Sequence, residues 1–463
     1  MNVAPIPVQM TASTINRLIA LFDGAFRALA PGLGMADAER MAALVHRSMS
    51  PRTRSYHTSD HVFDMCEGAN ARQTLAGLFH DLVYYQLDGG FPSGVAHRLK
   101  GAVRDEQGEI TIRPFAADDE VMVLCTGIFG FAAGQRLSVY AGLNEFMSAL
   151  VAGYQLHKHV QPTDLIGVMA CIEATIAFRN AVQNGESAPD LLARRVRAVT
   201  QAYLPDLVDA ALDAHVASVM RDAVEIGNRD VRGFALPSHA LFLSNTWLLI
   251  DESNAPLKSV GVYAICEYRI ALMRMAGFLA HLDPASIFQS YDGYPDAATL
   301  GEWTAVAAGN LRFACDYLDC KTVSVAIIEA LAKATGADAR VAMFLGDISS
   351  VQGKPDRAED YLPEVSPEMS LNDALLKVFE QGRAQASRND LTSSPLTAFT
   401  YRCIGQEGMR AAIAQAHRMF AGTITPLEFL HMLDHEMVRA IMRACARIAV
   451  SRRDALLALE ESF

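Results

Sequence analysis

The sequence lacks several features that mark secreted, membrane-spanning or nucleic-acid-binding proteins. Its eight cysteines are scattered over 463 residues without a CxxC pair, which predicts buried free thiols in a reducing cytoplasm rather than a disulfide framework. No run of about 18 apolar residues occurs, so we expect no membrane span, and the first residues lack the basic and apolar segments of a secretory signal. Lys and Arg number 40 against 52 Asp and Glu, so the basic excess typical of proteins that bind duplex DNA or RNA is missing.

Alternating β-branched runs are also scarce, and Glu109–Pro114 is the one candidate strand. Half of the residues (51%) are apolar, and they recur at the three- and four-residue spacing of a helix that buries one face. The runs that predict helices are Leu18–Leu29, Val139–Gly153, Asp164–Phe178, Val260–Leu282, Val323–Ala332 and Phe429–Val450. We therefore predict an all-α protein with a large buried core.

Two breaks indicate how the chain is organised. Ser349–Pro367 is polar and rich in Gly and Pro, which predicts a linker or a long surface loop. Asp292–Pro295 is interpreted as a turn. We predict an N-terminal helical domain over residues 1–290 and a C-terminal helical region over residues 291–463. The apolar helices of this second region are expected to form core or a homo-oligomer contact, and its His431 and His435 to be ordinary histidines.

One segment, Arg54–Asp88, carries the residues that point to chemistry. His57 and His61 are four residues apart, which on a helix would place both imidazoles on one face. His80 and Asp81 (the HD pair) follow inside an apolar helical pattern. A buried His and Asp need partners, and a divalent metal satisfies both. The spacing therefore predicts a metal site.

These residues resemble the HD superfamily of metal-dependent phosphohydrolases, which includes cyclic-nucleotide phosphodiesterases and bacterial HD-domain hydrolases. The resemblance covers about residues 40–290 and is most specific over residues 56–81. It implies an HD-domain-like helical bundle in which His61, His80 and Asp81 are metal ligands. It also implies that His57 is the histidine that either supports the ligands or donates a proton in catalysis, and we predict His57 as the catalytic residue.

The family's fourth ligand is an aspartate farther along the chain. Asp230 is our choice, because it follows a long helical stretch and precedes another apolar one. Asp164 and Asp222 are lesser candidates. The alternative for Asp230 is an exposed loop aspartate paired with Arg229 or Arg232. Leu82–Tyr85 departs from the animal phosphodiesterase pattern, which leaves the substrate open.

Other residues are candidates for the surroundings of the metal. Those predicted to hold a second metal or to hydrogen-bond the ligands are His157, His159 and Glu173. The alternatives are solvated histidines and a salt bridge between Glu173 and Arg179. The arginines predicted to bind phosphate are Arg54, Arg179 and Arg229, because a guanidinium binds a phosphate in a bidentate manner.

The predicted activity is metal-dependent hydrolysis of a phosphate ester or phosphodiester in a small, anionic, nucleotide-like substrate, by metal-activated water in the cytoplasm. The predicted cofactor is a divalent ion, with Mn, Fe, Zn, Co and Mg all left open. Two alternatives remain. One is an HD-type di-iron oxygenase, whose extra ligands only His157 and His159 would supply. The other is a non-catalytic, metal-binding regulatory protein whose C-terminal helices bind a partner.

Overall fold

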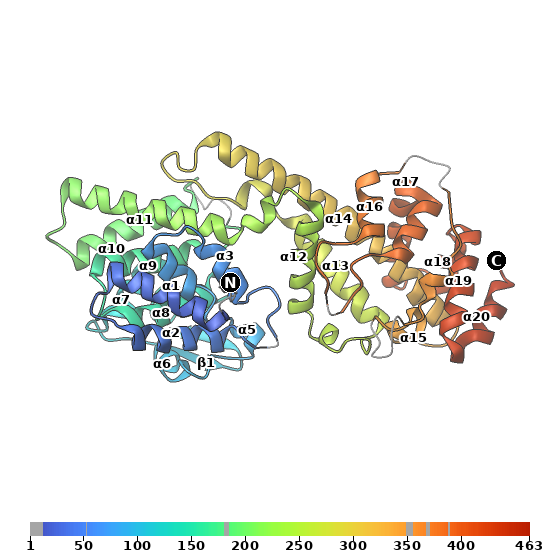
Figure 1. Ribbon diagram of the computed structural model, residues 1–463, viewed down its shortest axis with the longest axis horizontal. Coiled ribbons are helices and arrows are strands. Elements are labelled where there is room, and N and C mark those ends of the chain that lie inside the picture. Colours follow the sequence, from blue (N-terminus) through green and yellow to red (C-terminus); the bar gives the residue numbers. More distant parts are fainter. Residues whose placement is uncertain (1–12, 52, 180–184, 349–354, 367–370, 388) are drawn as a thin grey trace, which may run out of the picture. The chain divides into compact units, whose positions relative to one another are not determined.

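The computed structural model describes residues 13–51, 53–179, 185–348, 355–366, 371–387 and 389–463. These residues form twenty α-helices and one small three-stranded sheet, which confirms the predicted all-α fold (Figure 1). The chain divides into two compact units, Met1–Arg232 with Asp283–Thr304, and Gly233–Leu282 with Ala305–Phe463. This division differs from the predicted single break at residue 290, because residues 233–282 pack within the second unit and the chain then returns to the first. None of the described helices has both the length and the apolar composition needed to cross a bilayer.

The first unit is built around one helix that is buried on all sides. Its helices are α1 (Thr14–Leu29), α2 (Met35–Ser48), α3 (Ser59–Cys66), α4 (Ala71–Phe79), α5 (Tyr85–Asp88), α6 (Ala96–Ala102), α7 (Glu120–Phe129), α8 (Leu143–Leu156), α9 (Pro162–Ala174), α10 (Ala188–Tyr203) and α11 (Asp209–Asp230). Every residue of α9 from Leu165 to Ala174 is buried, because α4, α7, α8, α10 and α11 all pack against it. A helix that is apolar on every face is the expected choice for this central position.

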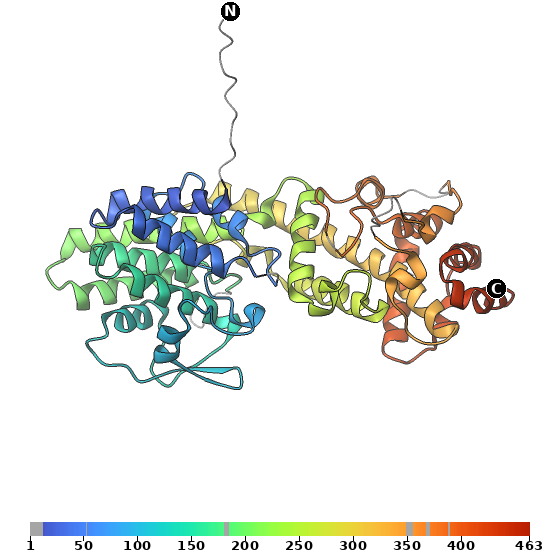
Figure 2. The same ribbon diagram turned by 60° about the horizontal axis from the view of Figure 1, so that its bottom comes forward.

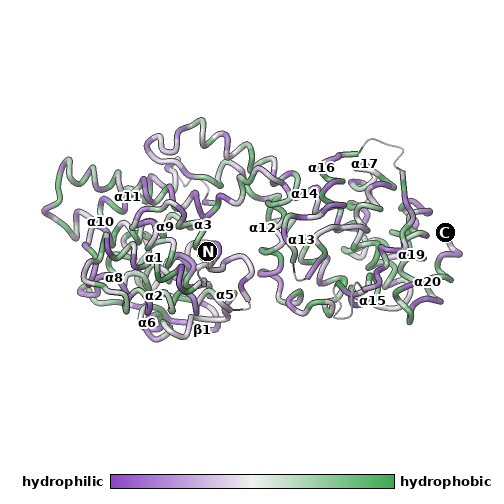
Figure 3. The backbone as a smooth tube through the Cα atoms, viewed as in Figure 1, coloured by the Kyte–Doolittle hydropathy of each residue, from purple (hydrophilic) through white to green (hydrophobic). Residues whose placement is uncertain are grey.

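The outer helices of this unit are amphipathic. The buried residues of α1 are Leu18, Phe22, Ala25 and Phe26, which recur within three or four positions of one another. Figure 3 shows hydrophilic and hydrophobic stretches interspersed along the backbone. The Phe22 ring packs edge-on against Phe79 at 5.6 Å between centroids. Burying an aromatic side chain of this kind contributes about 1.5–3 kcal/mol. This contact anchors the last residue of α4, which directly precedes the HD pair.

Within the described part of the chain, the strands form one small antiparallel sheet with the order β1 (Val103–Glu106), β2 (Glu109–Ile112) and β3 (Arg136–Leu137) (Figure 2). Val103 pairs with Ile112 and Ile110 pairs with Leu137. The predicted strand at 109–114 is confirmed in β2. The other two strands were not predicted, because β1 is largely polar and exposed and β3 has two residues.

Gly227 allows α11 to approach α9 closely. A Cβ atom at this position would lie 2.6 Å from the carbonyl oxygen of Ala174, at the end of α9. Any other residue would push the two helices apart, because the obstacle is backbone. The position of the last turn of α11, which ends at Asp230, therefore depends on this glycine.

The second unit is also helical. Its helices are α12 (His239–Ser253), α13 (Ile265–His281), the part of α14 (Ala297–Ala334) from Ala305 onward, α15 (Val341–Leu345), α16 (Asp373–Gln381), α17 (Pro395–Phe420), α18 (Pro426–His431), α19 (His435–Ile448) and α20 (Arg453–Glu460). The helix predicted over Phe429–Val450 is interrupted, because the Asp434 side chain accepts a hydrogen bond from the Met437 backbone N–H at 2.7 Å and begins a new helix. Short 3-10 turns complete the chain, at Val139–Ala141, Arg232–Ala235, Ala255–Lys258, Pro284–Ser286, Ala358–Tyr361 and Val450–Arg452.

Two predicted irregular segments have different outcomes. Tyr291 and Tyr294 exchange two backbone hydrogen bonds of 2.9 Å each, which confirms the turn at residues 292–295. Of the predicted linker Ser349–Pro367, residues 349–354 and 367 lie outside the described residues. The rest contains the turn Ala358–Tyr361, which packs against α19 and buries Ala358, so this part is not an exposed loop. All eight cysteines are free thiols.

Candidate metal centre

Three segments that are far apart in the sequence meet in the first unit. His61 lies in the first turn of α3, and Asp230 is the last residue of α11. The HD pair lies directly after α4, where His80 is the C-cap and Asp81 is in the following turn. The pair was predicted inside a helix, but α4 ends at Phe79, so both side chains project from a helix end.

The four predicted ligands lie within a few ångströms of one another. Ligand atoms of His61, His80 and Asp81 all lie within 4.8 Å of each other. The His80 Nε2 and Asp81 Oδ2 atoms are 3.0 Å apart, and His61 Nε2 is 4.0 Å from the same oxygen. Asp230 Oδ1 lies 2.9 Å from His61 Nε2 and 3.6 Å from His80 Nε2. We call these four residues the candidate metal centre.

The hydrogen bonding of His80 orients its second nitrogen toward the centre. His80 Nδ1 lies 2.8 Å from the carbonyl oxygen of Gly77. A carbonyl can only accept, so Nδ1 carries the hydrogen and donates it. The Nε2 atom of His80 and the Oδ2 atom of Asp81 are buried and have no hydrogen-bond partner. Ligand histidines in metalloproteins are held in this way, with one nitrogen bonded to the protein and the other free for the ion.

The charges of these groups are strongly coupled. Burial raises the pKa of Asp81, but the imidazoles of His80, His57 and His61 outweigh it and hold this pKa far below its ordinary value. Burial likewise raises the pKa of Asp230, but its hydrogen bond to His61 and the nearby imidazole of His80 outweigh burial and lower this pKa. Both carboxyl groups are therefore ionised at neutral pH. Two buried carboxylates and two imidazoles form a ligand set that fits a divalent ion such as Mn, Fe, Zn or Co.

His57 lies beside this centre, although not as predicted. The expectation that it shares a helix with His61 is wrong, because α3 begins at Ser59 and His57 lies in the preceding bend. Its ring centroid is 6.2 Å from that of His61 and 4.6 Å from that of Tyr84. Its charge contributes to the lowered pKa of Asp81. His57 is thus near the ligands without belonging to the ligand cluster.

Two of the arginines that were predicted to bind phosphate form structural hydrogen bonds around the candidate metal centre. The Arg54 side chain is buried and donates to Asp88 Oδ1 at 3.0 Å and to the Asp81 carbonyl oxygen at 2.7 Å. Arg229 donates to the carbonyl oxygens of Met65 and Glu67, which fixes the last turn of α11 against the end of α3. These contacts position Asp81 and the neighbour of Asp230. Phosphate binding by either arginine stays a prediction.

Glu173 is held by arginines. Its side chain is 1% exposed, and Oε1 lies 2.6 Å from both the Arg179 and the Arg195 guanidinium groups. This contact is the predicted alternative in which Glu173 forms a salt bridge with Arg179 and does not hydrogen-bond the metal ligands. Arg195 also donates to the Phe129 carbonyl oxygen at 2.6 Å, so the three side chains connect α7, α9 and α10.

The remaining candidates lie outside the ligand cluster found among the described residues. Asp164 and Asp222 are both paired with Arg72, at 3.2 and 2.5 Å, which leaves Asp230 as the aspartate that joins the histidines. His157 is the C-cap of α8 and His159 follows it. A second metal at these histidines stays a prediction.

One residue near the centre was not predicted from the sequence. Glu145, near the start of α8, has a buried Oε2 atom without a hydrogen-bond partner. Burial, together with the charges of Asp81 and Asp230, raises the pKa of Glu145 to about 7. The available signal was a carboxylate within the apolar run 143–156, which indicates a buried charge that needs a partner.

No family model, curated protein or solved structure matches this chain. The resemblance to HD phosphohydrolases therefore stays a prediction. The function is therefore inferred from the geometry of the candidate metal centre.

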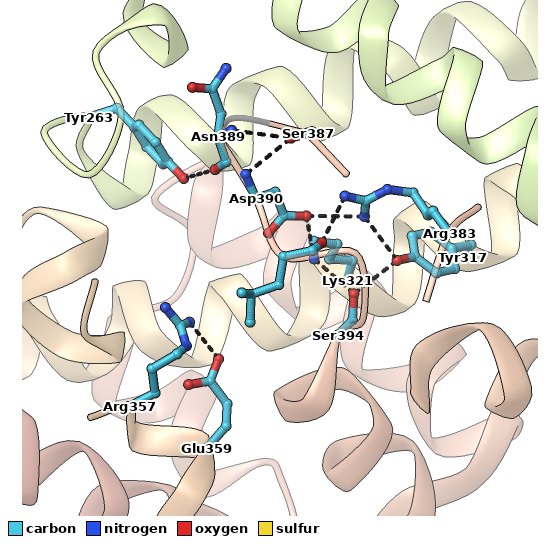
Figure 4. A network of polar contacts seen from close by, with 11 residues as sticks. Tyr263, Tyr317, Lys321, Arg357, Glu359, Arg383, Ser387, Asn389, Asp390 and Ser394 are labelled. Atoms are coloured by element: carbon cyan, nitrogen blue, oxygen red, sulfur yellow. Dashed lines mark hydrogen bonds and ion pairs between the residues drawn. The ribbon is translucent and has the colours of Figure 1, made fainter. Parts of the chain in front are cut away.

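The second unit contains a buried polar cluster that was not predicted (Figure 4). Lys321 Nζ lies 2.9 Å from Asp390 Oδ2 and donates to Ser394 Oγ at 2.9 Å, and Tyr317 OH is 2.9 Å from the same Ser394 oxygen. Arg383 is 3.2 Å from Asp390 Oδ2. Burial raises the pKa of Asp390, but Lys321 and Arg383 outweigh it and lower this pKa. Because Asp390 contacts both cations and Lys321 also bonds Ser394 at the start of α17, the cluster is best explained as a link between α14, α17 and the loop before α17.

Proposed function

We propose that this chain is a metal-dependent phosphohydrolase that cleaves a phosphate ester or phosphodiester in a small, nucleotide-like anion. The observation that carries this proposal is the candidate metal centre itself. Three remote segments bring two imidazoles and two carboxylates together, and His80 Nε2 and Asp81 Oδ2, which lie 3.0 Å apart, are buried without a hydrogen-bond partner. Leaving such atoms unpaired is costly unless a cation binds them.

Each residue of the site has a distinct task in this proposal. A divalent ion bound by His61, His80, Asp81 and Asp230 would polarise a phosphoryl oxygen and supply a water of lowered pKa. The Gly77 carbonyl keeps His80 in the required tautomer. His57, beside the ligands, protonates the leaving oxygen as a general acid.

The two alternatives have less support. A di-iron oxygenase needs additional ligands, and His157 and His159 are not part of the ligand cluster found in the described residues. A purely regulatory metal site needs no proton donor, and His57 lies within 6.2 Å of His61 between ring centroids. Both alternatives predict bound metal without phosphoester turnover, so a hydrolysis assay separates them from the proposal.

The test uses the full chain, stripped of metal with a chelator and reloaded with Mn²⁺. We expect turnover of bis(p-nitrophenyl) phosphate or p-nitrophenyl phosphate only after reloading. His80→Ala is expected to lose bound metal and turnover together. His215→Ala, a half-buried histidine of α11 outside the centre, is the matched control and is expected to retain both. The proposal is wrong if the wild-type chain binds no divalent ion, or binds it and hydrolyses neither substrate.

A further inference from the structure

Glu145 is fixed beside the candidate metal centre by the start of α8. The Tyr85 backbone N–H donates to Asn144 Oδ1 at 3.0 Å. The Val83 backbone N–H donates to Ser148 Oγ at 3.0 Å. Both donors belong to the short segment that directly follows the HD pair, so these bonds hold the first two turns of α8 against it. Glu145 lies between the two acceptor residues along the helix.

The carboxylate of Glu145 has no structural role that the described residues explain. Its Oε2 atom is buried and accepts no hydrogen bond. Among the described residues no ion pair reaches it, and the charged groups that act on its pKa are Asp81, Asp230 and His80. Most buried acids are paired, as Glu173 is with Arg179 and Arg195. An unpaired buried carboxylate destabilises the fold, and such exceptions concentrate at functional sites.

We propose that Glu145 is the general base of the reaction, and that its free Oε2 atom accepts the proton of the attacking water. This inference rests on the proposed phosphohydrolase function. In the step, the water oxygen forms a bond to phosphorus and its proton passes to Glu145. The ester P–O bond breaks, its electron pair stays with the leaving oxygen, and that oxygen takes a proton from His57.

The charges of the site are consistent with this role. The carboxyl groups of Asp81 and Asp230 are ionised at neutral pH, and a divalent cation bound by them would offset their two negative charges. The same cation would favour the ionised form of Glu145, which is the form that accepts a proton. In the proposed site Asp81 and Asp230 would hold the ion, whereas Glu145 Oε2, which has no hydrogen-bond partner, could accept a proton from the water. A base poised this way typically contributes 10²–10⁴-fold to the rate.

The first experiment compares Glu145→Gln with Glu106→Gln. Gln preserves the size of the side chain and removes the basic oxygen, and Glu106 is an exposed residue of β1 that serves as the control. Both variants and the wild type are loaded with Co²⁺, and bound metal is quantified. The visible absorption of bound Co²⁺ is then followed against pH, because its midpoint reports deprotonation at the centre.

For Glu145→Gln we expect unchanged Co²⁺ content and kcat lower by about 10²–10⁴-fold. We also expect the spectral midpoint to fall by about one pH unit or more, since a nearby negative charge that opposes deprotonation is removed. Glu106→Gln should match the wild type in all three measurements. A Glu145→Gln chain with the wild-type rate, the wild-type midpoint or no bound Co²⁺ would overturn the inference.

A second variant tests proton transfer directly. Glu145→Ala leaves space beside the centre, and added formate should restore part of its lost rate, whereas formamide, which is of similar size but is not a base, should not. Failure of formate to raise the rate would contradict a role as base. The proposed function can fail separately from this inference. If the wild-type chain binds Co²⁺ but hydrolyses no phosphoester, the proposed function is wrong. An unchanged midpoint of the Co²⁺ absorption in Glu145→Gln would then independently reject a position of Glu145 next to the metal-bound water.

Discussion

Replacing Asp230 with Asn removes one ionised carboxylate from the candidate metal centre and little else. Asn keeps the size of the side chain and retains an Oδ1 atom that can accept from His61, which lies 2.9 Å away. The metal-free variant should therefore fold normally. A divalent ion should increase the free energy of unfolding of the variant by less than it increases that of the wild type.

The size of this difference follows from mass action. An ion present at 100 times its Kd stabilises the folded chain by about 2.7 kcal/mol. At about 2–4 °C per kcal/mol for a unit of this size, the wild-type Tm should rise by about 5–11 °C. Loss of groups that only support a ligand lowers metal affinity by about 10–100-fold, so loss of a ligand should cost at least about 100-fold. At the same ion concentration the variant then gains about 0.4 kcal/mol, which is about 1–2 °C.

The assay is differential scanning calorimetry of chelator-treated protein with and without Mn²⁺, combined with titration calorimetry for the Kd. Asp222→Asn is the matched control, because Asp222 lies on the same helix and pairs with Arg72 at 2.5 Å, away from the histidines. It should keep the full metal-dependent rise in Tm. An equal rise in Asp230→Asn and the wild type would show that Asp230 is not a ligand. Equal loss in both variants would show that the effect comes from a disturbed α11.

Three further predictions concern other parts of the chain. His57→Ala should retain metal but lower kcat by about 10²–10⁴-fold for an alkyl phosphoester, with a much smaller loss for a nitrophenyl ester whose leaving group needs no proton; equal losses would refute proton donation. Gly227→Ala should destabilise the first unit by about 1–3 kcal/mol, measured by urea unfolding, because its Cβ would meet the Ala174 carbonyl oxygen at 2.6 Å; an unchanged midpoint would refute this close approach. Asp390→Asn should destabilise the chain by about 3–5 kcal/mol at pH 7, since two buried cations lose their partner. The pKa of Asp390 is lowered in the folded state, so the stability it contributes is full above its unfolded value near 3.8 and is lost as pH falls through the folded pKa. The difference between Asp390→Asn and wild type should therefore shrink in acid, and a constant difference would contradict the argument.

The candidate ligands could be found from the sequence because metal chemistry restricts residue type and spacing. His61, His80 and Asp81 come from one short segment, where a pattern search is effective. Asp230 depended on the resemblance and on its position after a long helical run, and the structure places it 2.9 Å from His61. Glu145 could not be identified this way, because a single Glu in an apolar run predicts burial but not what it faces.

The fold was predictable in class and less so in its boundaries. Helical periodicity identified α1 and α13, each of which buries one face, and the apolar runs of α8 and α9 were long enough to predict helices. Helix ends depend on local hydrogen bonds, as at Asp434, where one side-chain bond to Met437 begins a new helix. The division into units was not accessible, because residues 233–282 join the second unit through contacts made with residues much farther along the chain.

The way α4 and α11 end at the centre has a consequence for substrate binding. Both helices present their C-terminal ends there, with His80 as the C-cap of α4 and Asp230 as the last residue of α11. A helix C-terminus carries partial negative charge, which favours a cation and disfavours an anion. The buried guanidinium of Arg54 is already bonded to Asp88 and to the Asp81 carbonyl oxygen. Without a metal the centre therefore repels a phosphate, so in the proposed function the cation must bind before the substrate does.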